Sequence, residues 1–465
     1  MSHHHRGSFS NIGFILAAAG SAVGLGNIWR FPYLAGQSGG AVFLIFYLLC
    51  VFTLCFPVMI GEIAIGRNAR SDAYGSYRKL GGGHWGFLGL FGIITGVFIL
   101  SFYNVVSGWA FGYFLEISFG DLLNHPDFGT FFGEYVTNIG SNLWFSLGFM
   151  ILTAIIVAQG VQKGIEAASK IMMPSLYFIL LCLIIYSLTL PNAMEGVKFY
   201  LVPDISKVNI ETIFNGLRQA FFSLSLGMGT LMTYGSYMEK KQNLISSTAS
   251  IAIADTSVAF LAGLMIFPLV FSQGVEPTQG PPLVFIILPK IFHAMGPILG
   301  RVVGGSFFLL LCFAALTSTI SLLEVPAAYL VDQKKMPRRT VTWLTALLIF
   351  VVGLPSMLSQ GNVEFLTHLS FYKGKSFLDL VQELCDISLT VGGCLMCVFI
   401  IYRWKIQNLD EEIAHGNEGY ANSFIRKYLH VMIGYVGPVI LGIMSLLIIT
   451  HYFYGLDKLF GWDLK

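Results

Sequence analysis

The segment with the clearest chemical potential runs from Ala19 to Arg30, in the middle of the first long apolar stretch. It combines three glycines with polar side chains, namely Gly20, Gly24 and Gly26 with Ser21, Asn27 and Arg30. Each glycine weakens a helix by roughly 1 kcal/mol relative to alanine. Inside a bilayer, freed backbone N–H and C=O groups need partners, so a broken helix is tolerated only where it lines a cavity. We therefore expect a break that presents backbone groups to a small charged ligand.

The glycines also fit a purely structural explanation. Gly20 and Gly24 are four residues apart, which is the spacing of small residues that lets membrane helices pack closely. Asn27 and Arg30 favour a site instead, because polar groups at membrane depth generally mark ligand or ion binding.

Composition indicates a polytopic membrane protein. Of the 465 residues, 55% are hydrophobic and 11% are charged, whereas a soluble domain carries roughly a quarter charged residues. The net charge of +2 carries no information about nucleic-acid binding, and we expect no nucleic-acid partner. Eleven apolar stretches are expected to cross the bilayer, at residues 12–35, 41–66, 87–119, 143–160, 166–190, 211–236, 246–272, 298–330, 340–358, 377–402 and 430–454.

Lysine and arginine concentrate in every second connection between these stretches, around residues 67–79, 163–170, 240–241, 334–339 and 403–427. Basic loops stay on the cytoplasmic side of a membrane. We therefore expect a cytoplasmic N-terminus and, with eleven spans, an extracytoplasmic C-terminus in a bacterial inner membrane. We find no metal-spaced histidines, paired catalytic carboxylates or activated nucleophile, so the sequence does not indicate an enzyme.

The sixth stretch repeats the pattern of the first. Its segment 221–230, FFSLSLGMGT, places glycines and hydroxyls at mid-membrane. Interrupted helices in corresponding halves are typical of transporters built from inverted repeats, with the binding site between them. We expect one transmembrane domain over 1–465, with repeats at 10–190 and 211–403 and an additional helix at 427–456.

Three further polar groups lie in apolar stretches. Tyr103 is in the third stretch, Asp255 is in the seventh, and Thr317 is followed by Ser318 in the eighth. The hydroxyls either bond back to their own helix or offer two oxygens to a hard cation. Asp255 either lies near a wetted helix end or meets an ion, because a lone buried carboxylate is costly.

Together these segments resemble the neurotransmitter:sodium symporter family, in its bacterial amino-acid branch. The blocks 20–33, 221–237 and 313–318 carry the resemblance, which covers nearly the whole chain. It implies an all-α polytopic membrane protein with the LeuT-like five-plus-five inverted repeat, about eleven transmembrane helices, and helices 1 and 6 unwound at mid-membrane. It also implies sodium-coupled symport of a hydrophobic or aromatic L-amino acid by alternating access.

The resemblance implies two Na+ sites and no organic cofactor. The first would use the substrate carboxylate with the Ala22 carbonyl, Asn27, Ser223 and Asp255. Because Asp255 replaces an asparagine of the LeuT-like pattern, its fixed charge would substitute for chloride, and we expect no chloride requirement. The second would use carbonyls of Gly20, Val23 and Ala314 with the hydroxyls of Thr317 and Ser318.

The resemblance places the substrate between the broken helices. Monoamine transporters, which resemble this pattern, have an aspartate at the Gly24 position, so Gly24 implies a substrate with its own carboxylate. The apolar pocket implies an apolar or aromatic side chain. The implied substrate-binding residues are Ala22, Gly24, Leu25, Gly26, Ile99, Tyr103, Phe222, Ser223, Ser225, Met228 and Leu322.

The resemblance also implies gates. Arg30 would pair with an acid of the tenth stretch, for which we favour Asp379 over Glu383, and Gln219 would assist. Arg218 replaces a small residue of the LeuT-like pattern and adds charge to the outer vestibule. The implied residues on the cytoplasmic side are Tyr237 and Asp332 for the inner gate and Gly164 and Pro174 for a hinge at the start of the fifth stretch.

An alternative function is an amino-acid-binding sensor or receptor that does not transport. The gate and hinge residues favour the transporter. The expected partners are a small amino acid and the lipid bilayer, and nothing in the sequence indicates an oligomeric state.

Overall fold

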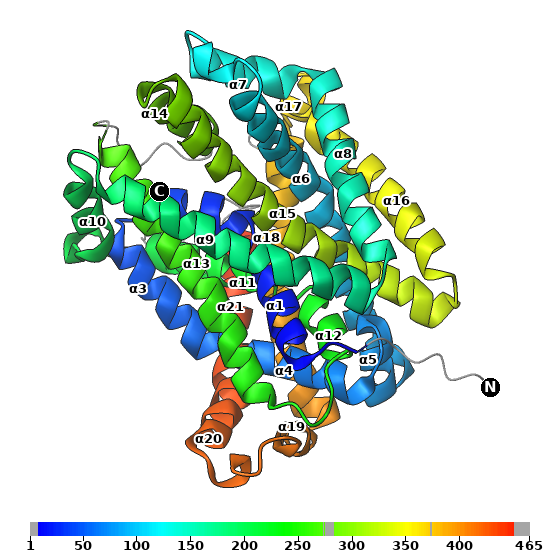
Figure 1. Cartoon of the computed structure of the whole chain (residues 1–465). Helices are drawn as coiled ribbons and strands as arrows, with labels where there is room; N and C mark the ends of the chain where they lie inside the picture. Colours follow the sequence, from blue (N-terminus) through cyan, green and yellow to red (C-terminus); the bar gives the residue numbers. More distant parts are fainter. Residues whose placement is uncertain (1–7, 273, 275–282, 373, 451–465) are drawn as a thin grey trace.

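The computed structural model describes residues 8–272, 274, 283–372 and 374–450. Regular structure in these residues is helical throughout, without strands, which confirms the all-α prediction. The long helices lie side by side in one bundle (Figure 1). Many of the outward-facing side chains are large and apolar, including Phe178 and Leu347, as a bilayer environment requires.

Within the described residues, nine helical segments are long and apolar enough to cross a membrane. They match nine of the predicted stretches. These segments are Ala41–Ala69 (α3, η2, α4), Gly83–Ser118 (η3, α6), Ile139–Ala158 (α8), Val161–Leu188 (η5, α9), Leu244–Ser272 (α13), Pro297–Lys334 (α15), Arg338–Leu358 (α16), Phe377–Trp404 (α18, η8) and Phe424–Ile449 (α20, η10, α21).

The first predicted stretch is a bent helix. Its first half, α1 (Asn11–Ala22), and its second half, η1 (Gly26–Arg30) with α2 (Phe31–Gln37), meet at an angle of 48°. The Ser10 side chain caps the start of α1 by accepting a hydrogen bond from the Gly13 N–H. The break falls between Val23 and Leu25, at the predicted glycine cluster.

The sixth predicted stretch consists of two short helices, α11 (Ile210–Ser223) and α12 (Thr230–Gly235). The chain between them adopts positive φ at Ser225 (55°), Gly227 (80°) and Gly229 (77°). Glycine adopts positive φ without steric strain from a Cβ, so the two glycines allow the chain to leave the helical conformation here. Both predicted breaks are therefore present in the helices that carry the glycines.

Shorter helices cover the two ends of the bundle. α7 (Phe128–Thr137) and α14 (Leu288–Ala294) lie at the upper end in Figure 1, whereas α5 (Ala73–Gly81) and α19 (Ile406–Ala414) lie at the lower end. The predicted repeats 10–190 and 211–403 stay predictions. The end of the additional helix predicted at 427–456 lies outside the described residues.

A buried ion pair connects α4 to α19. The side chains of Arg67 and Glu412 are fully buried, and Arg67 Nε lies 2.6 Å from Glu412 Oε1. Arg67 also donates to the Gln242 carbonyl at 2.9 Å, and Asn68 donates to the other Glu412 oxygen at 2.8 Å. Because both charges are hydrogen-bonded, their burial is tolerated. These bonds hold together α4, α19 and the segment between α12 and α13.

Helices α4 and α12 approach each other through glycine. A Cβ at Gly66 would lie 1.9 Å from the Met232 carbonyl oxygen, and one at Gly235 would lie 2.5 Å from the Ile63 carbonyl oxygen. These backbone atoms cannot move aside as a flexible side chain does, so the second half of the broken helix depends on this contact.

We predict that Gly66→Ala lowers the midpoint of thermal unfolding in detergent, because overpacking costs roughly 1–3 kcal/mol. The matched control is Gly434→Ala, where no atom lies within 4 Å of the added Cβ. Equal midpoints for the two variants would show that the α4–α12 contact is not tight.

Candidate ion and ligand site between the broken helices

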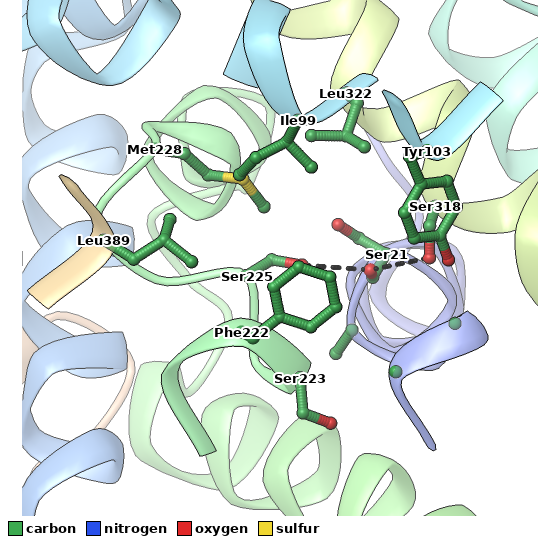
Figure 2. A pocket seen from close by; sticks show the side chains of 13 residues that line it. Ser21, Ile99, Tyr103, Phe222, Ser223, Ser225, Met228, Ser318, Leu322 and Leu389 are labelled. Atoms are coloured by element: carbon green, nitrogen blue, oxygen red, sulfur yellow. Dashed lines mark hydrogen bonds between the residues drawn. The ribbon is translucent and has the colours of Figure 1, made fainter. Parts of the chain in front are cut away.

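The two breaks face each other across a hollow. Figure 2 shows Met228, Ile99, Leu322 and Leu389 along its apolar side, while hydroxyls point in from the side of the first broken helix. Its lining residues are Ser21, Ala22, Gly24, Gly26, Ile99, Tyr103, Phe222, Ser223, Ser225, Met228, Ser318, Leu322 and Leu389. The predicted substrate residues therefore all line it except Leu25. Such a hollow suits a small ligand with one polar and one apolar end.

Leu25 reaches the site through its backbone. Its N–H donates to the Tyr103 hydroxyl at 2.7 Å, and Tyr103 extends from α6. Next to it, a Cβ at Gly24 would lie 2.4 Å from Ser318 Oγ and 2.5 Å from the Tyr103 hydroxyl oxygen. Glycine at position 24 is therefore required by this close approach, whatever ligand enters the hollow.

Asp255 of α13 lies behind the first break and is fully buried. It accepts hydrogen bonds from the Asn27 amide at 2.7 Å and from the Ser223 hydroxyl at 2.9 Å. The side-chain oxygen Oδ1 of Asn27 in turn accepts a hydrogen bond from the Gly24 N–H at 2.9 Å. The structure thus brings Asn27, Ser223 and Asp255 of the predicted first ion site together from three segments.

Tyr47 of α3 also donates to Asp255, at 3.2 Å. The sequence analysis did not identify Tyr47, because a tyrosine in an apolar helix is usually part of the packed core. The described hydrogen bonds to Asp255 all come from neutral donors, so a cation at this place would balance its charge.

The predicted second ion site is a cluster of oxygens between α1 and α15. Thr317 Oγ1 lies 3.2 Å from the Val23 carbonyl and 3.0 Å from the Ala314 carbonyl. Ser318 Oγ lies 3.4 Å from the same Val23 carbonyl. A Cβ at Gly20 would lie 3.3 Å from the Cβ and Cγ2 carbons of Thr317, so Gly20 lies close to these oxygens. Such an oxygen-only shell fits a hard cation.

Transition-metal ligands do not gather in the described residues, where no three His, Cys, Asp or Glu side chains form a metal-binding group. The two predicted ion sites offer carbonyl, hydroxyl and carboxylate oxygens, which alkali and alkaline-earth ions accept.

Two side chains of the second broken helix donate hydrogen bonds to the first broken helix. Ser225 donates to the Ser21 carbonyl at 3.0 Å, as Figure 2 shows, and Gln219 donates to the Gly26 carbonyl at 2.8 Å. Both acceptors are carbonyls in or beside the interrupted turn of the first helix. A ligand that binds one break will therefore affect the other.

Arg30 lies next to the hollow and stacks over the ring of the lining residue Phe222, with its guanidinium carbon 4.6 Å from the ring centroid. Arg30 Nη1 donates to Asp386 Oδ1 at 3.0 Å, and both residues are buried. This corrects the predicted partner. Asp379 is exposed and caps α18 through Ser376, and Glu383 binds Lys375 at 2.7 Å.

The prediction was wrong because α18 carries three acids within eight residues, and sequence spacing alone does not tell which of them faces Arg30. Asp386 lies one turn after Glu383 and shares its helix face. Its position in the middle of the apolar stretch, rather than at the stretch's polar start, was the available signal.

Just after α12, Tyr237 donates to Glu324 at 2.7 Å, and Arg338 donates to the same Glu324 oxygen at 3.0 Å. Asp332 accepts a hydrogen bond from the Asp72 N–H at 2.9 Å. Among the hydrogen bonds described here, Tyr237 is bonded to Glu324 and Asp332 to Asp72. The sequence analysis missed Glu324, although a carboxylate inside the eighth apolar stretch was a signal.

The predicted hinge residues lie at the start of the fifth span. Gly164 is within η5 (Val161–Glu166), where a Cβ would lie 1.9 Å from the Ile156 carbonyl oxygen, and Pro174 is inside α9 (Ala167–Leu188). The neighbouring Glu166 accepts hydrogen bonds from Ser10 at 2.6 and 3.1 Å. The irregular start of this span is thereby connected to the start of α1.

Comparison with known proteins gives consistent matches along the whole chain. The model of the sodium:neurotransmitter symporter family matches residues 6–128 and 130–459. The uncharacterized sodium-dependent transporter YhdH of Bacillus subtilis is 39% identical over 425 residues, covering 90% of this chain and 93% of the relative. An uncharacterized sodium-dependent transporter of Haemophilus influenzae is 35% identical over 413 residues, covering 85% and 89%.

Among solved structures, a crystal structure of MhsT in complex with L-phenylalanine superposes with a TM-score of 0.87 at 42% sequence identity. The match covers 95% of this chain and 99% of MhsT.

We predict that Asp386→Asn lowers the thermal unfolding midpoint more than Asp379→Asn, although both changes remove one carboxylate charge from α18. The first weakens a charge-assisted bond to buried Arg30, worth roughly 1.5–3 kcal/mol, whereas the second leaves an exposed helix cap that asparagine can also form. A larger loss for Asp379→Asn would contradict the assignment of Asp386.

Proposed function

Because the chain belongs to the sodium:neurotransmitter symporter family and is therefore a sodium-dependent membrane transporter, we propose that it takes up a hydrophobic or aromatic L-amino acid together with sodium, without a chloride requirement. The observation that carries this proposal is the two-sided hollow between the broken helices. Oxygen clusters suited to hard cations border it on one side and apolar side chains on the other.

The proposed substrate orientation follows from the groups at each break. The substrate carboxylate meets the Leu25 and Gly26 N–H groups, where the second half of the first helix begins and its dipole favours an anion. The Tyr103 hydroxyl, now bonded to the Leu25 N–H, turns to the carboxylate. The amine meets the Ser225 hydroxyl and the carbonyls of Ala22, Phe222 and Ser223.

The substrate side chain then faces Ile99, Met228 and Leu322, which favours an apolar or aromatic residue. The L-phenylalanine bound in the MhsT structure supports this class. Gly24 supports an α-amino acid over an amine, because its close contacts leave no space for an acidic side chain that would replace a missing carboxylate.

We infer two sodium sites. The first combines Asn27, Ser223 and Asp255 with the Ala22 carbonyl and the substrate carboxylate, so that sodium and substrate are ligands of each other. The second combines carbonyls of Gly20, Val23 and Ala314 with the hydroxyls of Thr317 and Ser318. Their close approach across α1 and α15 means that an ion there joins the two helices.

The absence of a chloride requirement is inferred from Asp255. Its carboxylate is buried among neutral donors beside the first proposed sodium site. A fixed negative charge at this place offsets the sodium charge, which a mobile anion would otherwise have to do.

Transport by alternating access requires a gate on each side of the hollow. We propose that the Arg30–Asp386 pair, with Gln219, opens and closes the outer side, and that the Tyr237–Glu324–Arg338 contacts, with Asp332, close the cytoplasmic side. Gly164 and Pro174 act as the hinge. In this orientation the N-terminus is cytoplasmic and the protein lies in a bacterial inner membrane. Inward sodium movement then gains ~2.3 kcal/mol per charge per 100 mV.

We predict that proteoliposomes containing the protein accumulate radiolabelled L-phenylalanine or L-leucine only under an inward sodium gradient, and equally well when gluconate replaces chloride. Uptake that stops without chloride would refute the role of Asp255 and leave sodium coupling intact. Binding of these amino acids without uptake would favour the sensor over the transporter.

The same assay separates the second sodium site from general helix damage. Thr317→Ala removes a proposed ligand and is expected to raise the sodium concentration for half-maximal uptake by roughly tenfold, the loss of about one hydrogen-bond-sized contribution. The matched control is Thr319→Ala on the same helix, whose hydroxyl bonds Thr153 at 2.8 Å. Equal sodium dependence in both variants would contradict the site.

A further inference from the structure

A second set of charges lies one helical turn beyond the Arg30–Asp386 pair. Glu383 precedes Asp386 by three residues on α18, and Arg218 precedes Phe222 by four residues on α11. Residues three or four apart share a helix face one turn apart. Phe222 lies under Arg30, and α11 and α18 pack against each other. Arg218 and Glu383 therefore occupy neighbouring positions on the outer side of the first pair.

The two carboxylate oxygens of Glu383 differ in their surroundings. Oε1 lies 2.7 Å from Lys375 Nζ, in the segment that precedes α18. Oε2 is buried and has no hydrogen-bond partner among the described residues. A buried carboxylate oxygen without a partner is costly. Arg218 and Asp386 both lie within electrostatic range of this carboxylate.

Arg218 is itself held in place from a third segment. It donates to the Asn215 side-chain oxygen, and the Asn215 amide donates to Ser38 Oγ, just after α2, at 3.3 Å. The guanidinium is partly buried beside the first broken helix. The position of Arg218 therefore depends on the packing of α11 against the end of α2. The same packing places Arg30 over Phe222.

The carboxylates of Glu383 and Asp386 on consecutive turns repel each other unless cations lie between α18 and its neighbours. Those cations come from three separate segments: Arg30 from η1, Arg218 from α11 and Lys375 from the connection before α18. All four elements must therefore be close for the charges to balance.

We propose that Arg218 and Glu383 form a second charged layer of the outer gate, one helical turn outside Arg30 and Asp386, that slows escape of the bound amino acid. This inference rests on the proposed function. Both residues act by holding α11 and α18 together, and neither contacts the substrate. Two stacked charge layers must separate before the hollow opens, so removing either charge of the outer layer speeds opening.

The test is the dissociation rate of tritiated L-phenylalanine from purified full-length protein in sodium buffer, measured after adding excess unlabelled amino acid. We expect Glu383→Gln and Arg218→Gln each to speed dissociation by roughly threefold to tenfold, in the lower part of the range of coupling between neighbouring residues. The double variant is expected to dissociate no faster than the faster single variant. The conservative variants Glu383→Asp and Arg218→Lys are expected to restore most of the slow rate.

Asp379→Asn is the matched control, because it removes a carboxylate from the same helix at an exposed cap that bonds only Ser376 among its described side-chain contacts. It is expected to keep the wild-type rate. Wild-type rates in both neutralised variants, or effects that multiply in the double variant, would overturn the second layer. Failure of the wild-type protein to hold the amino acid would instead contradict the proposed function, and the layer with it.

Discussion

Every backbone group freed inside a bilayer needs a partner, and this constraint organises the whole site. At the first break, Tyr103 accepts the Leu25 N–H, Gln219 binds the Gly26 carbonyl, and Thr317 and Ser318 approach the Val23 carbonyl. Because side chains from distant helices satisfy these groups, breaking a helix forces those helices together. The partners that replace water are also the ligands that a substrate or ion would use.

At the second break, a freed backbone group is bonded by a carboxyl side chain. The Gly227 N–H donates to Glu62 of α4 at 2.7 Å, where the carboxylate is buried. Buried carboxylates recur around the site: Asp255 lies behind the first break, Asp386 bonds Arg30, and Glu324 bonds Tyr237 and Arg338. Each bonds groups from other segments of the chain, so each holds together elements whose relative movement would open or close the hollow.

The sequence predicted those features whose chemistry conflicts with a membrane helix. Glycines beside Asn27 marked the first break, and a carboxylate in an apolar stretch marked Asp255. Features that look ordinary in a membrane helix escaped prediction: Tyr47 resembles a core aromatic residue, and Leu389 is one apolar residue among many. The choice of Asp379 over Asp386 failed for another reason, since the rotational orientation of α18 is set by packing against neighbours and not by its own sequence.

The central claim is that sodium and the amino acid share one site built on the broken helices. The most direct measurement is the equilibrium affinity for tritiated L-phenylalanine over a range of sodium concentrations, with potassium as the balancing cation. Linkage requires that sodium tighten amino-acid binding and that saturating amino acid lower the half-saturating sodium concentration by the same factor. An affinity that is unchanged when potassium replaces all of the sodium would contradict the shared site.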